Sequence, residues 1–238
     1  MTTLLTVANL TYKRNLKTIL EDLNLTLEPN QIVGLLGANG AGKTTLMRLI
    51  AGAATSYHGT IRLGDQGTPA ERKAIVSFSE QVAGVNDNRR LVNIADFYDH
   101  VYPDFDMANF RKLATDLGLG LDQRFNQLSR GNHQKFVVAI ALSRHAKLYL
   151  LDEPFNGIDS MSRKKIVSSI IEWKPEMATI LVSDHHVTDI ANILDAVAVV
   201  KDHTIVDQKK ADEIRENNGQ SIEDYYESFY AEGETDND

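Results

Sequence analysis

Cysteine is absent from this chain, which excludes disulfide bonds and thiolate metal sites and fits a reducing compartment. Long apolar runs are absent as well, since none approaches the roughly 18 residues that a membrane-spanning helix needs. The first residues lack the basic start and the long apolar stretch of a signal peptide. We therefore expect a soluble, cytoplasmic protein that can still bind a membrane protein.

An excess of basic charge is also missing, because the net charge is −8. Most of it lies in residues 211–238, which hold ten acidic side chains and one basic side chain. The rest of the chain holds 24 basic and 23 acidic side chains. Such a balance argues against a nucleic-acid partner. We expect the acidic segment to be a solvated, partly disordered tail, with a contact peptide that uses its aromatic residues as the alternative.

One glycine-rich segment carries most of the chemistry. Residues 37–44 match the pattern G-x-x-x-x-G-K-[ST] of a phosphate-binding loop, between an apolar strand-like run and a helix-like segment. Glycines let successive backbone N–H groups approach phosphate oxygens, and the following helix adds the positive end of its dipole. Lys43 can reach the β- and γ-phosphates, and the Thr44 hydroxyl can bind Mg²⁺. We expect these residues to bind a nucleotide: Gly37, Asn39, Gly40, Ala41, Gly42, Lys43, Thr44 and Thr45.

A second motif is an apolar run, residues 148–151, that ends in two carboxylates. A buried strand normally avoids adjacent acids, so Asp152 and Glu153 need a reason to be there. Asp152 can hold the Mg²⁺ that neutralises the phosphates, and Glu153 can orient and deprotonate an attacking water. The alternative is that both acids only cap the next segment.

A third motif, Leu128-Ser129-Arg130-Gly131-Asn132, precedes a helix-like segment. Ser129 and the small Gly131 would leave a hydroxyl and backbone N–H groups open at a helix N-terminus, which suits an anion. Taken alone, the pattern is better explained by an ordinary capped helix.

Strand-like and helix-like segments alternate, which is typical of a largely parallel α/β sheet. The expected strands are residues 4–10, 23–27, 32–36, 61–63, 74–78, 148–151, 179–183 and 197–200. The expected helices are residues 91–101, 107–117, 132–143, 160–173 and 187–194. All three motifs fall at strand ends or helix starts, where ligands of such sheets bind.

Together the three motifs resemble the ATP-binding subunit of an ABC transporter: Gly37–Thr44 is similar to its Walker A loop, Leu148–Glu153 to Walker B, and residues 128–132 to the Leu-Ser-Gly-Gly-Gln signature. The resemblance covers about residues 7–207. It implies a P-loop NTPase (RecA-like) α/β core with an N-terminal antiparallel β region and an inserted α-helical subdomain. We expect the core at 1–84 and 145–210, the helical subdomain at 85–144 and the acidic tail at 211–238.

The resemblance implies roles for further residues. Tyr12 falls where the family stacks an aromatic ring on adenine, although a tyrosine in a strand can also serve packing alone. Gln81 matches the glutamine that touches Mg²⁺ and water, and His185 matches the histidine that contacts the γ-phosphate, with His186 beside it. Asp159 matches the D-loop aspartate. Implied catalytic residues are Glu153, His185 and Gln81; implied metal ligands are Thr44, Gln81 and Asp152.

Some residues depart from the family pattern. Arg130 and Asn132 stand where Gly and Gln are usual, but Ser129 and Gly131 are retained, so we expect activity to survive. Ala38 replaces a common proline in the Walker A loop. Asp184 replaces a Thr or Ser, and we expect its carboxylate to point away from the γ-phosphate.

We therefore expect an ATP-hydrolysing subunit, with ATP and Mg²⁺ as cofactors, that drives a separate membrane permease. The resemblance is to small Gram-positive export-type, antibiotic-responsive ABC ATPases, and it implies a homodimer or a paralogous partner peripheral to the inner face of the plasma membrane. The alternatives are a non-transport ABC ATPase and an ATP-dependent regulatory or antibiotic-sensing module. The long coiled-coil insertions of DNA-associated relatives and the double cassette of ribosome-associated ones have no counterpart in this sequence.

Overall fold

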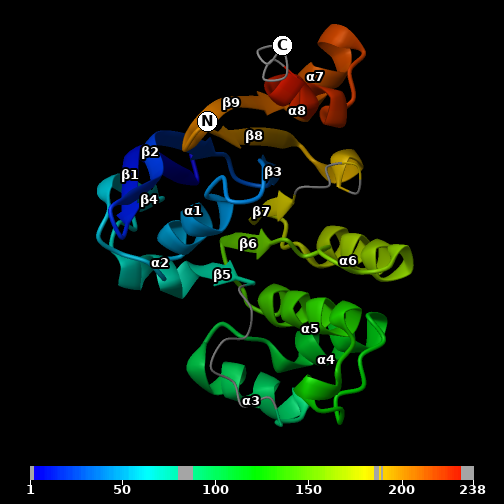
Figure 1. Ribbon diagram of the computed structural model, residues 1–238. Helices are drawn as coiled ribbons and strands as arrows, with labels where there is room; N and C mark the ends of the chain where they lie inside the picture. Colours follow the sequence, from blue (N-terminus) through cyan, green and yellow to red (C-terminus); the bar gives the residue numbers. More distant parts are fainter. Residues whose placement is uncertain (1–2, 80–87, 185–187, 189, 232–238) are drawn as a thin grey trace.

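A six-stranded sheet runs through the centre of the computed structural model, which describes residues 3–79, 88–184, 188 and 190–231 (Figure 1). Its strand order is β5-β6-β7-β3-β8-β9, in which β9 alone runs antiparallel to its neighbour. The bounds are β3 Ile32–Leu36, β5 Val76–Phe78, β6 Leu148–Asp152, β7 Thr179–Asp184, β8 Ala196–Lys201 and β9 Thr204–Lys210. The predicted, largely parallel α/β sheet is confirmed.

The central strands are apolar on both faces because both faces are covered. Along β6, Leu148 and Leu150 pack into one hydrophobic cluster, while Tyr149 and Leu151 pack into another. The alternation follows the period of two in a strand. A continuous apolar run is therefore what a central strand of this sheet requires.

A second, antiparallel sheet covers one face. It has the order β2-β1-β4, with bounds β1 Leu5–Arg14, β2 Lys17–Leu27 and β4 His58–Leu63. Helix α1 (Lys43–Ile50) lies between the two sheets, because its Leu46, Met47, Leu49 and Ile50 share one cluster with strands of both. The predicted N-terminal antiparallel region is thus confirmed.

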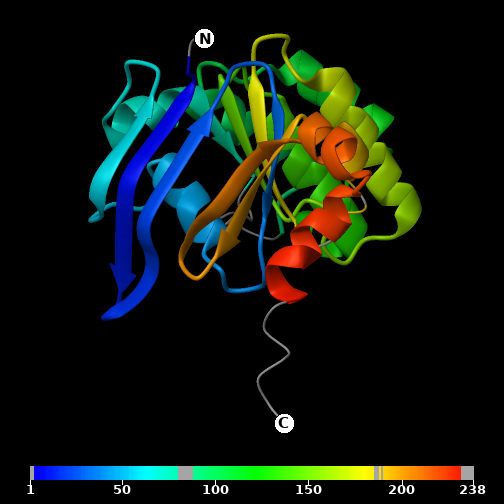
Figure 2. The same ribbon diagram turned by 90° about the horizontal axis from the view of Figure 1, so that it is seen from above.

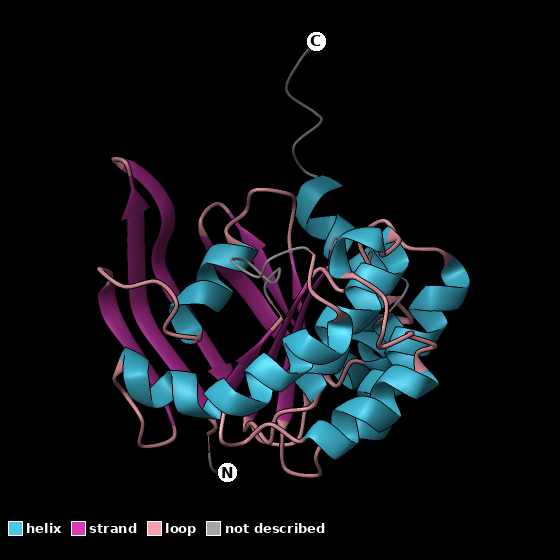
Figure 3. Ribbon diagram, turned by 90° about the horizontal axis from the view of Figure 1, so that it is seen from below, coloured by secondary structure: helices cyan, strands magenta, loops and turns pink. Residues whose placement is uncertain are grey.

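Helices cover the opposite face, and Figure 3 shows most of them gathered on one side of the molecule. Their bounds are α3 Leu91–Val101, α4 Met107–Asp116, α5 Arg130–Leu142 and α6 Ser160–Trp173, with a 3₁₀ turn at Phe125–Gln127. Asp106 caps α4 by accepting a hydrogen bond from the backbone N–H of Asn109 at 2.9 Å. The packed rings of Phe105, Phe110 and Phe136 join α4 to α5.

Strands β1 and β2 extend beyond the predicted 4–10 and 23–27, and two other predicted segments differ from the structure in type. Residues 74 and 75 belong to helix α2 (Pro69–Ile75), not to the predicted strand 74–78. Thr68 and Glu71 form a capping box and Pro69 opens the helix, so local capping starts a helix where we predicted only a strand. In the described part of 187–194, the predicted helix is replaced by a 3₁₀ turn at Ala191–Ile193.

The prediction of a solvated, partly disordered tail is wrong for residues 211–231. They form helices α7 (Ala211–Asn218) and α8 (Ile222–Ala231). Ala211, Ile214, Ile222 and Tyr225 are buried in the core, so apolar residues at helical spacing outweigh the acidic composition. Residues 232–238 lie outside the described residues.

Candidate functional site

Residues 37–44, called the Walker-like loop below, surround the amine of Lys43. This side chain is 4% exposed, and its Nζ donates hydrogen bonds to the carbonyls of Gly37 at 2.5 Å and Ala38 at 3.1 Å. Gly42, just before α1, has φ of 107°, and a Cβ there would lie 2.7 Å from Cδ2 of Leu20. Only glycine fits such a backbone at such a close approach. The loop and the start of α1 therefore form a compact turn that holds a buried cation.

Burial lowers the pKa of Lys43, and the carboxylates of Glu153, Asp152 and Asp184 act in the opposite direction. Asp152 and Glu153 lie at the end of β6 and Asp184 lies at the end of β7. Because β3, β6 and β7 are parallel, these acids lie at the same edge of the sheet as the loop that follows β3. The amine is thus desolvated and faces negative charge, an arrangement that recurs at functional sites.

Asp152 is the last residue of β6, and hydroxyl groups from both neighbouring strands hold it. Its Oδ1 accepts a hydrogen bond from Oγ of Ser183 at 2.6 Å, and its backbone N–H donates to Oγ of Ser79 at 3.1 Å. Ser183 lies in β7 and Ser79 directly follows β5. The other carboxylate oxygen of Asp152 is not used in these bonds, and the side chain lines a cavity.

Glu153 sits in a strained turn, since its φ of 45° is rare for a residue with a side chain. Its backbone N–H donates to the carbonyl of Ser183 at 3.1 Å and to Oγ of Ser183 at 3.0 Å. Its Oε2 accepts a hydrogen bond from Nδ2 of Asn156 at 2.9 Å. Glu153 lines the cavity that Thr44 of α1 also lines.

The cavity brings these segments together in a volume of about 280 Å³. Its described lining combines the start of α1, the ends of β5 and β6 and one face of α5: Thr44, Arg48, Ser79, Gln134, Val137, Asp152, Glu153 and Asn156. Sequence reasoning found Thr44, Asp152 and Glu153. It gave no site role to Ser79, Gln134 or Asn156. The signal for Ser79 is its place directly after a parallel strand, because ligands of such sheets bind at the carboxyl ends of the strands.

Asp184 corrects an expectation. Its residue is 1% exposed, in register with Leu36 of β3, so the carboxylate is enclosed and does not point out to solvent. It contributes to the field around the Lys43 amine. Because β7 is buried along its whole length, a side chain at its end has little choice but to lie inside.

The signature-like residues lie at the start of α5, next to α6. Ser129 caps α5, and its Oγ accepts a hydrogen bond from the backbone N–H of Asn132 at 3.2 Å. A Cβ at Gly131 would lie 3.3 Å from Oγ of Ser162 and 3.7 Å from Oδ2 of Asp159. Neither Ser129 nor Gly131 lines the cavity of Thr44, Asp152 and Glu153.

Asp159 is the N-cap of α6. Its Oδ1 accepts hydrogen bonds from the backbone N–H groups of Met161 and Ser162, at 3.0 and 2.9 Å, and its Oδ2 accepts from Oγ of Ser162 at 2.7 Å. Hydrogen bonding by the Ser162 backbone and hydroxyl lowers the pKa of Asp159. Asp159 therefore fixes the first turn of α6, which lies next to Gly131.

The remaining predicted site residues fall in two groups. Tyr12 lies in β1, half-buried, and pairs in register with Leu20, the residue that contacts Gly42. It is therefore one strand away from the loop. Gln81 and His185, like His186, lie outside the described residues.

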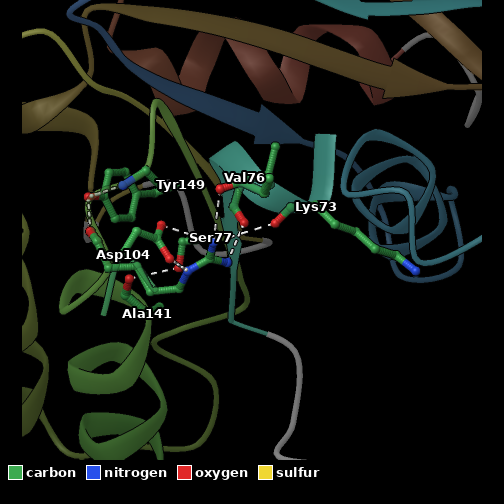
Figure 4. Close-up of polar contacts among 9 residues, drawn as sticks. Lys73, Val76, Ser77, Asp104, Ala141 and Tyr149 are labelled. Atoms are coloured by element: carbon green, nitrogen blue, oxygen red, sulfur yellow. Dashed lines mark hydrogen bonds and ion pairs between the residues drawn. The ribbon is translucent and has the colours of Figure 1, made fainter. Parts of the chain in front are cut away.

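A second cavity of about 350 Å³ lies between helices α3 and α5 on one side and α2 and β5 on the other, and Arg144 is one of its lining residues. The guanidinium of Arg144 bonds both carboxylate oxygens of Asp104 at 3.0 Å and the carbonyl of Val76 at 2.7 Å (Figure 4). It also stacks on the ring of Tyr102, 4.1 Å from its centroid. Arg144 thus ties the end of α5 to both sides of this groove.

Comparisons with known proteins agree with this geometry. Residues 20–156 match the sequence profile of a family described as "ABC transporter". Over the parts of the chain that the structure describes, no helix is both long and apolar enough to cross a membrane.

Curated relatives carry related names. The chain is 28% identical to ABC transporter ATP-binding protein YtrB of Bacillus subtilis, over 83% of this chain and 69% of the relative. It is 34% identical to the taurine import ATP-binding protein TauB of Escherichia coli, over 73% and 70%. It is 27% identical to the lantibiotic transport ATP-binding protein SrtF of Streptococcus pyogenes, over 88% and 92%.

The fold has a counterpart among solved structures. An ATP-binding subunit of an ABC transporter superposes with a TM-score of 0.84 at 23% identity, covering 96% of this chain and all of the other. The fold, the motifs and the profile match lead to one conclusion: the chain belongs to the ABC transporter family, as an ATP-binding domain of the kind that hydrolyses ATP to power transport.

Proposed function

We propose that this chain is the ATP-hydrolysing subunit of an exporter whose permease is a separate membrane protein. The observation that carries the proposal is the meeting of Thr44, Asp152 and Glu153 at one cavity, with the buried amine of Lys43 in the electrostatic field of the two carboxylates. Phosphoryl transfer needs mainly positioning and charge neutralisation, and this cavity offers both.

The triphosphate would lie over the turn at residues 37–45, where backbone N–H groups and the amine of Lys43 face it. Mg²⁺ would be held by the hydroxyl of Thr44 and the carboxylate of Asp152, with Gln81 as the third group that the resemblance implies. Oxygen ligands of this kind suit Mg²⁺, and both described ones line the cavity. The ion neutralises phosphate charge when bound.

Glu153 would act as general base. Glu153 lines the cavity at the end of β6, beside Asp152 and Thr44, and Asn156 donates a hydrogen bond to its carboxylate, so a carboxylate base stands where a water can meet the phosphate. His185 would contact the γ-phosphate and Tyr12 would stack on adenine, roles that rest on the resemblance.

A second copy of this chain would complete the site. Ser129 and Gly131 lie at a helix N-terminus and do not line the cavity of Thr44, Asp152 and Glu153 in their own chain. Packed head to tail, the N-terminus of one copy would meet the γ-phosphate held by the other, and Asp159 would steady that contact. A paralogous subunit in place of the second copy is the alternative.

The groove beside Arg144 would receive the permease. Tyr98 and Tyr102 line it, and Phe97 and Val101 on the same helix are 47% and 48% exposed, which is apolar surface that a partner helix can cover. We propose that residues 85–144 form the subdomain that moves with this partner, on a core of 1–84 and 145–210. The chain would then lie on the cytoplasmic face of the plasma membrane.

Export is the direction that the sequence favours, through the likeness to small export-type subunits in residues 97–106 and 128–135. Relatives do not share one direction in their names, since TauB is named for taurine import and SrtF for lantibiotic transport. The direction therefore needs the permease to be identified.

The test is to purify a tagged Glu153→Gln variant with ATP and Mg²⁺ from detergent-solubilised membranes. Slow hydrolysis should hold the closed dimer, and one integral membrane protein should co-purify in near-equal amount. A matched Glu153→Gln, Lys43→Ala variant should bring down much less of it, because it binds ATP weakly. Recovery of soluble partners alone would favour a non-transport ABC ATPase, and recovery of no partner would contradict a permanent permease subunit.

A further inference from the structure

The last helix of the chain ends against the Walker-like loop. Figure 2 shows α8, in red, ending beside the blue loop that joins β3 to α1. The phenol oxygen of Tyr230 accepts a hydrogen bond from the backbone N–H of Ala38 at 3.2 Å and donates one to the carbonyl of Val200 at 3.3 Å. One hydroxyl therefore joins the loop, the end of β8 and the C-terminal helix.

The donor in this contact exists because residue 38 is alanine. A proline, the common residue at this place in the family, has no N–H and could not reach Tyr230 through a hydrogen bond. The chain combines the unusual alanine with a tyrosine that uses the amide which alanine supplies.

Several contacts hold α8 in place for this bond. Nζ of Lys201 donates to the carbonyl of Phe229 at 2.6 Å and lies 5.5 Å from the centroid of the Tyr230 ring. The hydroxyl of Tyr225 donates to Oδ2 of Asp207 at 2.7 Å. These bonds fasten the helix to β8 and β9, so the tyrosine is carried by a fixed support.

The contact lies on the same peptide groups that hold the amine of Lys43. Nζ of Lys43 bonds the carbonyls of Gly37 and Ala38, which flank the amide that Tyr230 accepts from. At Gly37 the loop also lies close to the backbone of β8, since a Cβ on residue 37 would be 2.6 Å from the carbonyl oxygen of Val200. A shift of this amide would therefore move the groups that orient Lys43.

We propose that Tyr230 is a positioning residue for the ATP site, and that the C-terminal helix pins the entry of the phosphate loop through it. The loop is then ordered before ATP arrives, so binding does not have to order it. The inference rests on the proposed role of residues 37–45 in phosphate binding. It gives residues 222–230, which lie beyond the end of the resemblance near residue 207, a part in nucleotide affinity.

Tyr230→Phe removes the hydroxyl and keeps the ring. This removes its bonds to the amide of Ala38 and to the carbonyl of Val200. We expect Tyr230→Phe to raise the Kd and KM for ATP about two- to tenfold, the effect of losing the hydrogen bond to the loop, with little change in kcat at saturating ATP. Ala38→Pro removes only the donor on the loop and should give a similar increase. The double variant should bind ATP no more weakly than Tyr230→Phe alone, because the bond that Ala38→Pro removes is already absent there.

The matched control is Ser228→Ala, which removes a hydroxyl of the same helix that bonds the carbonyl of Tyr225 within that helix. It should leave the Kd for ATP unchanged. An equal increase in Ser228→Ala would overturn the proposal, since it would trace the effect to the helix in general. Unchanged affinity in Tyr230→Phe, or additive effects in the double variant, would also overturn it. Lys43→Ala tests the phosphate-binding role of residues 37–45 separately from the role of Tyr230. Normal ATP affinity in Lys43→Ala would refute the loop assignment itself.

Discussion

At the scale of single residues, the hydroxyl of Ser183 joins the two acids at the end of β6, because it donates to the carboxylate of Asp152 and accepts from the backbone N–H of Glu153. The sequence indicates Lys43, Asp152 and Glu153 because loop glycines and paired acids after an apolar run have few other uses. It does not indicate that Glu153 takes a left-handed backbone, or that Ser183 bonds both Asp152 and Glu153. Those features depend on the neighbouring strand, which lies about thirty residues away in the chain.

Asp184 shows the same limit. From the sequence, a charge near the γ-phosphate looks unfavourable, so the side chain is expected to turn outward. In the fold, both faces of β7 are covered and the carboxylate faces the region of Lys43, whose positive charge offsets it. A local argument misses a compensating charge that only the tertiary structure brings near.

Glu153→Gln tests the most specific residue assignment. The variant should bind ATP as tightly as the unmodified chain but release phosphate about 10²–10⁴ times more slowly, because the amide cannot accept the proton of water. Phosphate release and nucleotide binding are measured on the same preparation. Glu176→Gln, on the exposed surface before β7, is the control and should hydrolyse normally. An unchanged rate in Glu153→Gln would remove this residue as the base.

At the scale of elements, long amphipathic helices could be predicted and short capped ones could not. The bounds of α3 and α6 coincide with prediction, since apolar spacing and flanking residues agree there. Helix α2 has seven residues, too few for a clear period, and only its Thr68–Glu71 capping box marks it in the sequence. Strand β9 was not predicted, because it is an edge strand with mostly polar, exposed residues and lacks the apolar run of the central strands.

Arg144 is the element-scale test, because it joins the end of α5 to the α3–α4 connection and to β5. Arg144→Ala would leave the carboxylate of Asp104 and the buried carbonyl of Val76 without this partner. We expect a loss of about 3–5 kcal/mol in the free energy of unfolding, measured by urea denaturation. Arg90→Ala removes an exposed pair with Asp122 and should cost less than about 1 kcal/mol. Equal losses would show that the Arg144 contacts carry no special weight.

At the scale of the whole molecule, the class of sheet could be predicted but not its strand order or its C-terminal cover. Alternating segments indicate parallel pairing, whereas the order β5-β6-β7-β3-β8-β9 arises from contacts between distant residues. Composition misled the prediction of the tail, because four buried apolar residues suffice to dock two acidic helices. Ser129 does not line the cavity of Thr44, Asp152 and Glu153, which also belongs to this scale and agrees with the proposal of two chains per ATP site.

The most direct test of that claim is the mass of the Glu153→Gln variant in solution, with and without ATP and Mg²⁺, by sedimentation velocity. ATP should convert monomer to dimer. Ser129→Arg in the same background should bind ATP yet stay monomeric, because the bulky cation blocks the capping site. A monomer that carries bound ATP without Ser129→Arg, or a dimer that persists with it, would contradict an ATP site shared between two copies through their signature residues.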